Sequence, residues 1–110
     1  MGETALGEFE QVVLLAILRQ GDGAFALEVR REIERESGRG VSRGAFYTTL
    51  ERLRRKGLVT WHEARPAGSR RREVHRLFSV TPEGMEMLRS TKRQLQARWT
   101  SLADALEESS

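Results

Sequence analysis

The stretch VSRGAFYTTLERLRRKGLV, residues 41–59, decides the fold expected for this chain. Ser42 has the side chain of a helix N-cap and Gly57 suits a C-terminal stop, so the stretch predicts a helix from Arg43 to Lys56. The apolar residues at positions 46, 50 and 53 fall on one face of this helix, which is expected to be buried. Most other positions are polar or basic, so the opposite face is expected to be exposed.

Two further helices are predicted before this stretch. Residues 8–20 carry apolar side chains on a broad face, which predicts a largely buried helix. Residues 26–37 have few apolar positions, and glutamates recur every four residues across Glu28–Glu36, near Arg31 and Arg35. This pattern predicts an amphipathic surface helix with ion pairs between its own residues.

A hairpin and a long helix are predicted after the stretch. Residues 58–63 and 74–80 have strand character, and the segment between them contains Pro, Gly and a basic edge, which indicates a hairpin with an extended tip. Thr81 and Pro82 suit the start of a last helix that reaches about residue 107. Such a helix would be roughly 39 Å long at about 1.5 Å per residue, too long to lie wholly against a small core.

The last helix carries an apolar seam with alternating steps of three and four residues, interrupted by Lys92. An exposed stripe of this length indicates a partner surface, and a two-fold homodimer is the commonest solution. Trp99 on the seam is interpreted as dimer packing, with the stacking of a small aromatic effector as the alternative. The predicted dimerisation residues are Met85, Leu88, Leu95, Trp99, Leu102 and Leu106.

Charge is distributed unevenly along the chain. The net charge is only +3, yet residues 39–76 hold eleven Arg or Lys against three acidic residues, and the flanks are acidic. A basic middle is typical of a polyanion-binding surface, and arginine suits phosphates and guanine edges. The chain has no cysteine, which excludes disulfides and thiolate chemistry.

The order of three helices, a basic hairpin and a long helix predicts a mainly α fold with a small β-hairpin, namely a winged helix-turn-helix with a C-terminal dimerisation helix. In such folds the second helix of the helix-turn-helix enters the major groove of double-stranded DNA. The three consecutive arginines at residues 70–72 would then lie at the hairpin tip, within reach of the DNA backbone or the minor groove. The predicted DNA-binding residues are Ser42, Arg43, Gly44, Ala45, Tyr47, Thr48, Arg52, Arg70, Arg71 and Arg72.

Two other classes of function compete with DNA binding. His62 and His75 on neighbouring strands, with Glu63 or Glu73, could hold a metal ion, but their spacing matches no ligand pattern and no catalytic motif is present. We therefore expect no enzyme, no metal and no cofactor. A winged-helix module that binds an acidic protein partner is the main alternative to a DNA operator as the partner.

The sequence also predicts the cellular location of the protein and the division of the chain into functional parts. Met1–Glu10 lacks a basic start followed by an apolar run, and no apolar stretch approaches the roughly 20 residues that span a bilayer, so we expect a cytoplasmic protein without a membrane partner. The expected division is a DNA-binding part over residues 1–81 and a dimerisation helix over residues 82–110.

Three stretches of the sequence resemble the PadR family of transcriptional regulators. The resemblance rests on residues 41–59, on RRREVHRLFSVTPEG at 70–84 and on the Gly-Glu-Phe-Glu at residues 7–10, and it covers roughly residues 7–107. The family implies a homodimeric winged helix-turn-helix, usually a repressor, and some members respond to phenolic acids or drugs. The resemblance also implies a DNA-contact role for Tyr47. Thr48 and Phe78 depart from the residues common in the family.

Overall fold

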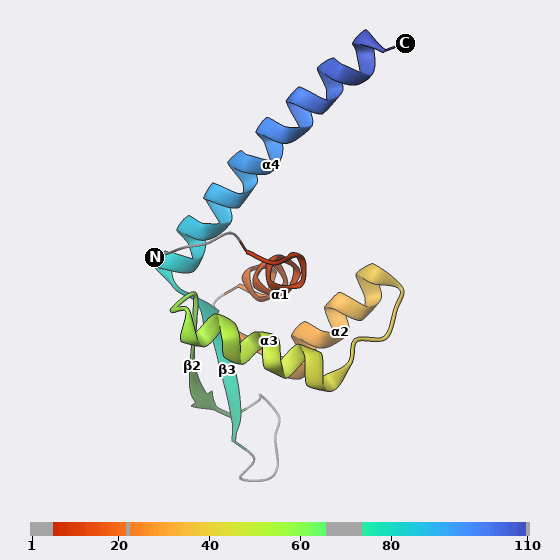
Figure 1. Ribbon diagram of the computed structural model, residues 1–110. Helices are drawn as coiled ribbons and strands as arrows, with labels where there is room; N and C mark the ends of the chain where they lie inside the picture. Colours follow the sequence, from red (N-terminus) through yellow and green to blue (C-terminus); the bar gives the residue numbers. More distant parts are fainter. Residues whose placement is uncertain (1–5, 22, 66–73, 110) are drawn as a thin grey trace.

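The computed structural model describes residues 6–21, 23–65 and 74–109. Three helices and a small sheet form a body from which a long last helix projects, opposite the hairpin (Figure 1). The molecule extends over 62 × 34 × 24 Å. The elements in chain order are α1 (Glu8–Arg19), β1 (Ala24–Phe25), α2 (Ala26–Ser37), α3 (Arg43–Arg55), β2 (Val59–Ala64), β3 (His75–Val80) and α4 (Pro82–Glu108).

The helix ends lie at the residues whose chemistry predicted them. Ser42 Oγ accepts a hydrogen bond from the backbone N–H of Ala45 at 3.3 Å, which confirms the predicted N-cap of α3. Thr81 caps α4 in the same way, with proline at the first helical position. Gly57 follows α3 with φ of +77°, a left-handed conformation that glycine adopts without strain.

The sheet has one more strand than the sequence indicated. β2 and β3 form the predicted antiparallel hairpin, with Val59 opposite Val80 and Ala64 opposite His75. The two-residue strand β1 pairs with the other edge of β3, so the strand order is β1-β3-β2. The prediction missed β1 because two residues are too few to show an alternating pattern.

The core lies between the three helices and the inner face of the sheet. Phe46 and Leu53 of α3 pack with Leu14 and Ile17 of α1, all almost completely buried, as the apolar faces of both helices predicted. The ion pairs of α2 differ from the prediction. Its glutamates Glu32 and Glu36 reach across to Arg19 of α1, while Arg30 and Glu34 form a pair within α2.

The start of α4 is fixed tightly to the body. A Cβ atom at Gly84 would lie 2.3 Å from the carbonyl oxygen of Leu58, so only glycine permits this approach. Thr81 adds hydrogen bonds at the same junction, because its hydroxyl donates to the carbonyl of Gly57 at 2.6 Å and its N–H donates to Leu58 at 3.0 Å. α4 therefore starts directly on the segment that ends α3. Within the described ranges, no helix combines the length and apolar character needed to cross a membrane.

Candidate nucleic-acid interface

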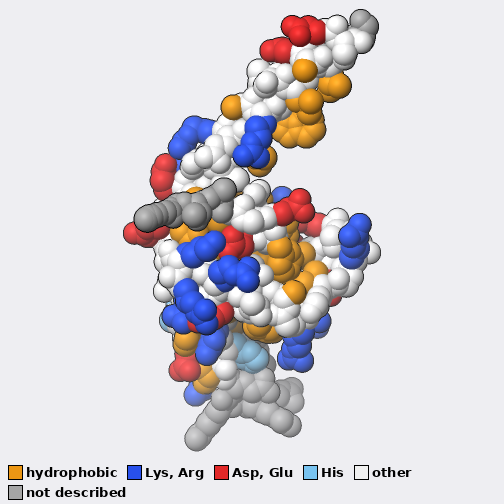
Figure 2. Space-filling view, in the orientation of Figure 1, with side chains coloured by type: hydrophobic (Ala, Val, Ile, Leu, Met, Phe, Trp, Pro, Cys, Tyr) orange, Lys and Arg blue, Asp and Glu red, His pale blue; other side chains and the backbone are white. Residues whose placement is uncertain are grey.

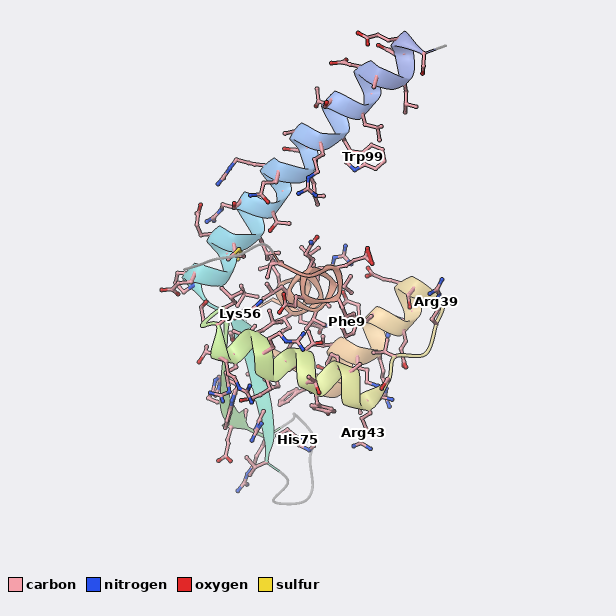
Figure 3. The ribbon with its side chains drawn as sticks, in the orientation of Figure 1. Phe9, Arg39, Arg43, Lys56, His75 and Trp99 are labelled. Carbon is pink, nitrogen blue, oxygen red and sulfur yellow. The ribbon has the colours of Figure 1, made fainter. Side chains whose placement is uncertain are left out.

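α3 presents a polar and basic face to solvent. Its first turn contains no acidic residue, and Arg43, Gly44 and Ala45 are exposed at the free N-terminal end. Arg43 projects from this end on the side of the body away from α4 (Figure 3). Ser42 accepts a hydrogen bond from the N–H of Ala45, and the exposed helix end still carries partial positive charge, so it suits a phosphate or another anion.

A shallow hollow of about 350 Å³ runs along the same face of α3. Tyr47, 42% exposed, stands at one end with its ring edge against buried Phe46, at a centroid distance of 5.2 Å. The sequence-predicted residues Thr48 and Arg52 lie beside it. Two other members, an acid and an arginine, were not predicted. The lining residues are Tyr47, Thr48, Glu51, Arg52 and Arg55.

The turn between α2 and α3 is held by hydrogen bonds. Gly38 ends α2 in the left-handed region, with φ of +69°. The N–H of Val41 then donates to the Glu34 carboxylate at 2.9 Å, which ties the turn back to α2. This contact orients α3 relative to α2, as a helix-turn-helix requires.

The C-terminal end of α3 is joined to α1 by a partly buried ion pair. Lys56 Nζ lies 2.9 and 3.1 Å from the two carboxylate oxygens of Glu10, whose side chain is only 6% exposed. Burial alone would raise the pKa of Glu10, but hydrogen bonds from Lys56 and from the Gly7 N–H, together with the charges of Lys56 and Arg52, lower it. Glu10 is therefore a carboxylate that fixes the position of α3.

The hairpin is described only near its base. The Arg76 guanidinium lies over the Trp61 ring at 4.2 Å, so one arginine of the hairpin stacks on an aromatic ring. Arg70, Arg71 and Arg72, the predicted contacts at the tip, lie outside the described residues.

The two histidines lie on adjacent strands, as predicted, but they are not opposite each other. His62 pairs with Leu77 and His75 with Ala64. Over residues 6–21, 23–65 and 74–109, no cluster of three or more His, Cys, Asp or Glu side chains could hold a metal ion.

A second surface lies between α1 and α4. A groove of about 590 Å³ is lined by Leu15 and Leu18 of α1 and by the apolar stripe of α4. Hydrophobic side chains gather on one side of the projecting helix and on the nearby surface of the body (Figure 2). Trp99, which is 64% exposed, projects from this side of α4 (Figure 3).

The predicted dimerisation residues fall into two groups. Met85 and Leu88, near the start of α4, are half-buried, and Leu88 packs against the core of its own chain. The later residues reach beyond the body and stay exposed. They are Leu95, Trp99, Leu102 and Leu106.

Solved structures of similar architecture are known. A PadR-like transcriptional regulator from Bacillus cereus shares 18% identity, with a TM-score of 0.73 over 89% of this chain and 90% of that chain. A PadR family transcription regulator from Clostridium difficile R20291 shares 18% identity, with a TM-score of 0.69 over 89% and 98%. RosR of H. salinarum shares 21% identity, with a TM-score of 0.66 over 94% and 96%. At these identities the likeness shows a shared fold.

A comparison with curated protein sequences gives no match. The model of the transcriptional regulator PadR-like family matches residues 14–90, a segment that includes the second half of α1, all of the helix-turn-helix, the hairpin and the start of α4. The chain therefore belongs to the PadR-like family of transcriptional regulators.

Proposed function

We propose that this regulator binds double-stranded DNA as a homodimer and represses transcription from an operator with inverted-repeat symmetry. The observation that carries the proposal is the exposed face of α3, which begins at an acid-free N-terminus with Arg43, continues through Tyr47 and reaches Arg52 in the last turn. One α-helix fits the major groove, and its N-terminal residues meet the base edges. The same proposed contact surface includes Ser42, Gly44, Ala45 and Thr48. The proposed contacts of Arg70, Arg71 and Arg72 rest on the sequence alone.

The groove between α1 and α4 supports the dimer. The exposed stripe of α4 has no cover within the described part of the chain, and it continues into the apolar face of α1 at Leu15 and Leu18. A second copy offers an identical stripe, so two-fold packing would bury both at once. In the proposed division, residues 1–81 bind DNA and residues 82–110 dimerise. Two recognition helices would then meet half-sites about one helical turn apart, or a multiple of it.

A titration against duplex DNA tests the proposal. Duplexes enriched from a random pool should bind far more tightly than random duplex, and the logarithm of the affinity should fall linearly with the logarithm of salt concentration, by roughly 0.9 per phosphate contact. Sedimentation should give a dimer at micromolar concentration. A salt-independent association, or equal affinity for every duplex, would favour the alternative of an acidic protein partner.

The groove also supports a small aromatic effector as a second ligand. Trp99 offers an exposed ring at one end of an apolar surface large enough for a planar molecule. Planar aromatic compounds should quench tryptophan fluorescence and lower operator affinity. Quenching that persists unchanged in Trp99→Phe would place the ligand elsewhere, for example near Trp61.

A further inference from the structure

Glu51 is the one acidic residue of α3, and it stands in the middle of the face proposed to meet DNA. It lies one turn after Tyr47 and one turn before Arg55, and all three line the hollow on α3. The other lining residues are polar or basic. An anion among them opposes the attraction that the rest of the surface exerts on phosphate, so the residue needs a functional or structural reason to be there.

Neighbouring arginines hold the Glu51 carboxylate in one orientation. Arg54 Nε donates to Glu51 Oε1 at 3.1 Å, and Arg54 Nη2 contacts the other oxygen. Arg55 Nε lies 3.6 Å from Glu51 Oε2. The hydrogen bond from Arg54 lowers the pKa of Glu51, so the group stays ionised at neutral pH.

The carboxylate still has capacity for another donor. Its two oxygens offer about four acceptor positions, of which the bidentate contact with Arg54 uses two and Arg55 approaches a third. The side chain is 37% exposed, so the remaining positions are accessible to a ligand. A duplex pressed against this face would displace water from the carboxylate, which costs free energy unless a base supplies a hydrogen-bond donor.

In the major groove, the exocyclic amino group of cytosine is the donor that glutamate accepts from. We propose that Glu51 is a specificity-determining residue that accepts a hydrogen bond from the N4 amino group of one cytosine in each half-site. This inference rests on the proposed function. Basic residues of the same face attract any duplex, whereas Glu51 favours those that present this donor. Specificity thus arises from an unfavourable contact at wrong sequences as well as a favourable one at the right sequence.

The experiment combines a protein change with a base change. Duplexes enriched with the wild-type protein should share a fixed C·G pair in each half-site. Replacing that cytosine by the pyrimidin-2-one nucleotide removes the amino group and keeps guanine as the partner. Wild-type affinity should fall about tenfold, whereas Glu51→Ala should bind both duplexes equally. Random duplex should bind Glu51→Ala about fivefold more tightly, because each protomer of the proposed dimer loses one repulsive charge.

Glu86→Ala is the matched control. Glu86 is an exposed acid of α4 that forms similar pairs with Arg89 at 3.5 Å and Arg93 at 3.6 Å, so the variant has the same change in net charge. It should keep the wild-type sensitivity to the modified base. If Glu51→Ala loses as much affinity as the wild type on the modified duplex, or if no cytosine in the enriched site is sensitive, the inference is wrong. A wild-type protein that enriches no duplex would instead refute the proposed function.

Discussion

The Lys56→Met substitution isolates the ion pair that joins α1 to the end of α3. Methionine keeps the aliphatic stem of the side chain, so the change removes mainly the charge and two hydrogen bonds to Glu10. Loss of one partner from a buried ion pair typically costs about 3–5 kcal/mol. Two features reduce the cost here: Lys56 is 36% exposed in the wild type, and the Gly7 N–H still donates to Glu10 at 2.8 Å.

Protonation of the unpaired Glu10 reduces this cost. Protonating an ordinary carboxyl group with a pKa of 4.5 at pH 7 costs about 3.4 kcal/mol. Glu10 of the variant can therefore become neutral instead of remaining a buried charge without its partner. We therefore expect Lys56→Met to lower the free energy of unfolding by about 2–3 kcal/mol at pH 7. The corresponding fall in Tm is roughly 10 °C. Thermal and urea denaturation followed by circular dichroism, at one fixed protein concentration, measures both quantities.

The pH dependence distinguishes this cause from a packing defect. The wild-type pKa of Glu10 is lowered on folding, so its stabilising contribution is present above the ordinary pKa of 4.5 and is lost as pH falls through the folded value. Without Lys56, burial should raise the pKa of Glu10 above its ordinary value, so the variant should gain relative stability as pH falls. The difference between the proteins should shrink from pH 7 to pH 4. A difference that stays constant with pH, or is below 1 kcal/mol at pH 7, would refute the reasoning.

Four other variants probe the two proposed surfaces and the junction between them. Arg43→Ala and Tyr47→Phe should each weaken operator binding by about 1–3 kcal/mol in anisotropy titrations, without lowering Tm, because both side chains are exposed. Leu95→Glu combined with Leu102→Glu should give monomers in sedimentation and abolish specific binding, because the charges fall on the exposed apolar stripe. Gly84→Ala should destabilise the fold by about 2 kcal/mol or more in urea denaturation, because its Cβ would meet backbone at 2.3 Å.

Three of these four variants have a matched control. Arg98→Ala removes the same charge from an exposed position on α4 and should leave operator affinity unchanged. Gln94→Glu with Ser101→Glu adds two charges to another face of α4 and should leave the dimer intact. Gly40→Ala, where no atom lies within 4 Å of the added Cβ, should leave stability unchanged. A control that behaves like its partner variant would contradict the assignment of that surface.

Local chemistry made most of the fold predictable. A capping serine, a threonine followed by proline and a glycine with positive φ each lie where the sequence placed a helix end, within about one residue. The buried faces of α1 and α3 followed from helical spacing in the same way. These signals depend on neighbours along the chain, so one sequence is enough to identify them.

Several contacts between distant residues could not be predicted. β1 exists only because β3 pairs with it, and Glu10 meets Lys56 across 46 positions of the chain. Arg19 of α1 forms ion pairs with Glu32 and Glu36 of α2, which were expected to pair within their own helix. Glu51 was visible in the sequence, but its place in the hollow beside Tyr47 depends on the exposed surface of the folded chain. Spacing gives the face of a helix, and tertiary structure decides which partners that face meets.

The close contact of Gly84 with the backbone of Leu58 anchors only the start of α4, directly after α3. The rest of α4 therefore acts as a lever with its pivot at this contact. The helix is 27 residues long, or about 40 Å at 1.5 Å per residue. A tilt of about 5° at the pivot would move the far end by roughly 3.5 Å, close to the rise of one base pair. In the proposed dimer, substitutions at this junction could therefore change the distance between the two recognition helices by a base-pair step. The spacing of the half-sites that the proposed dimer meets could thus change while the proposed DNA-contact residues of α3 stay the same.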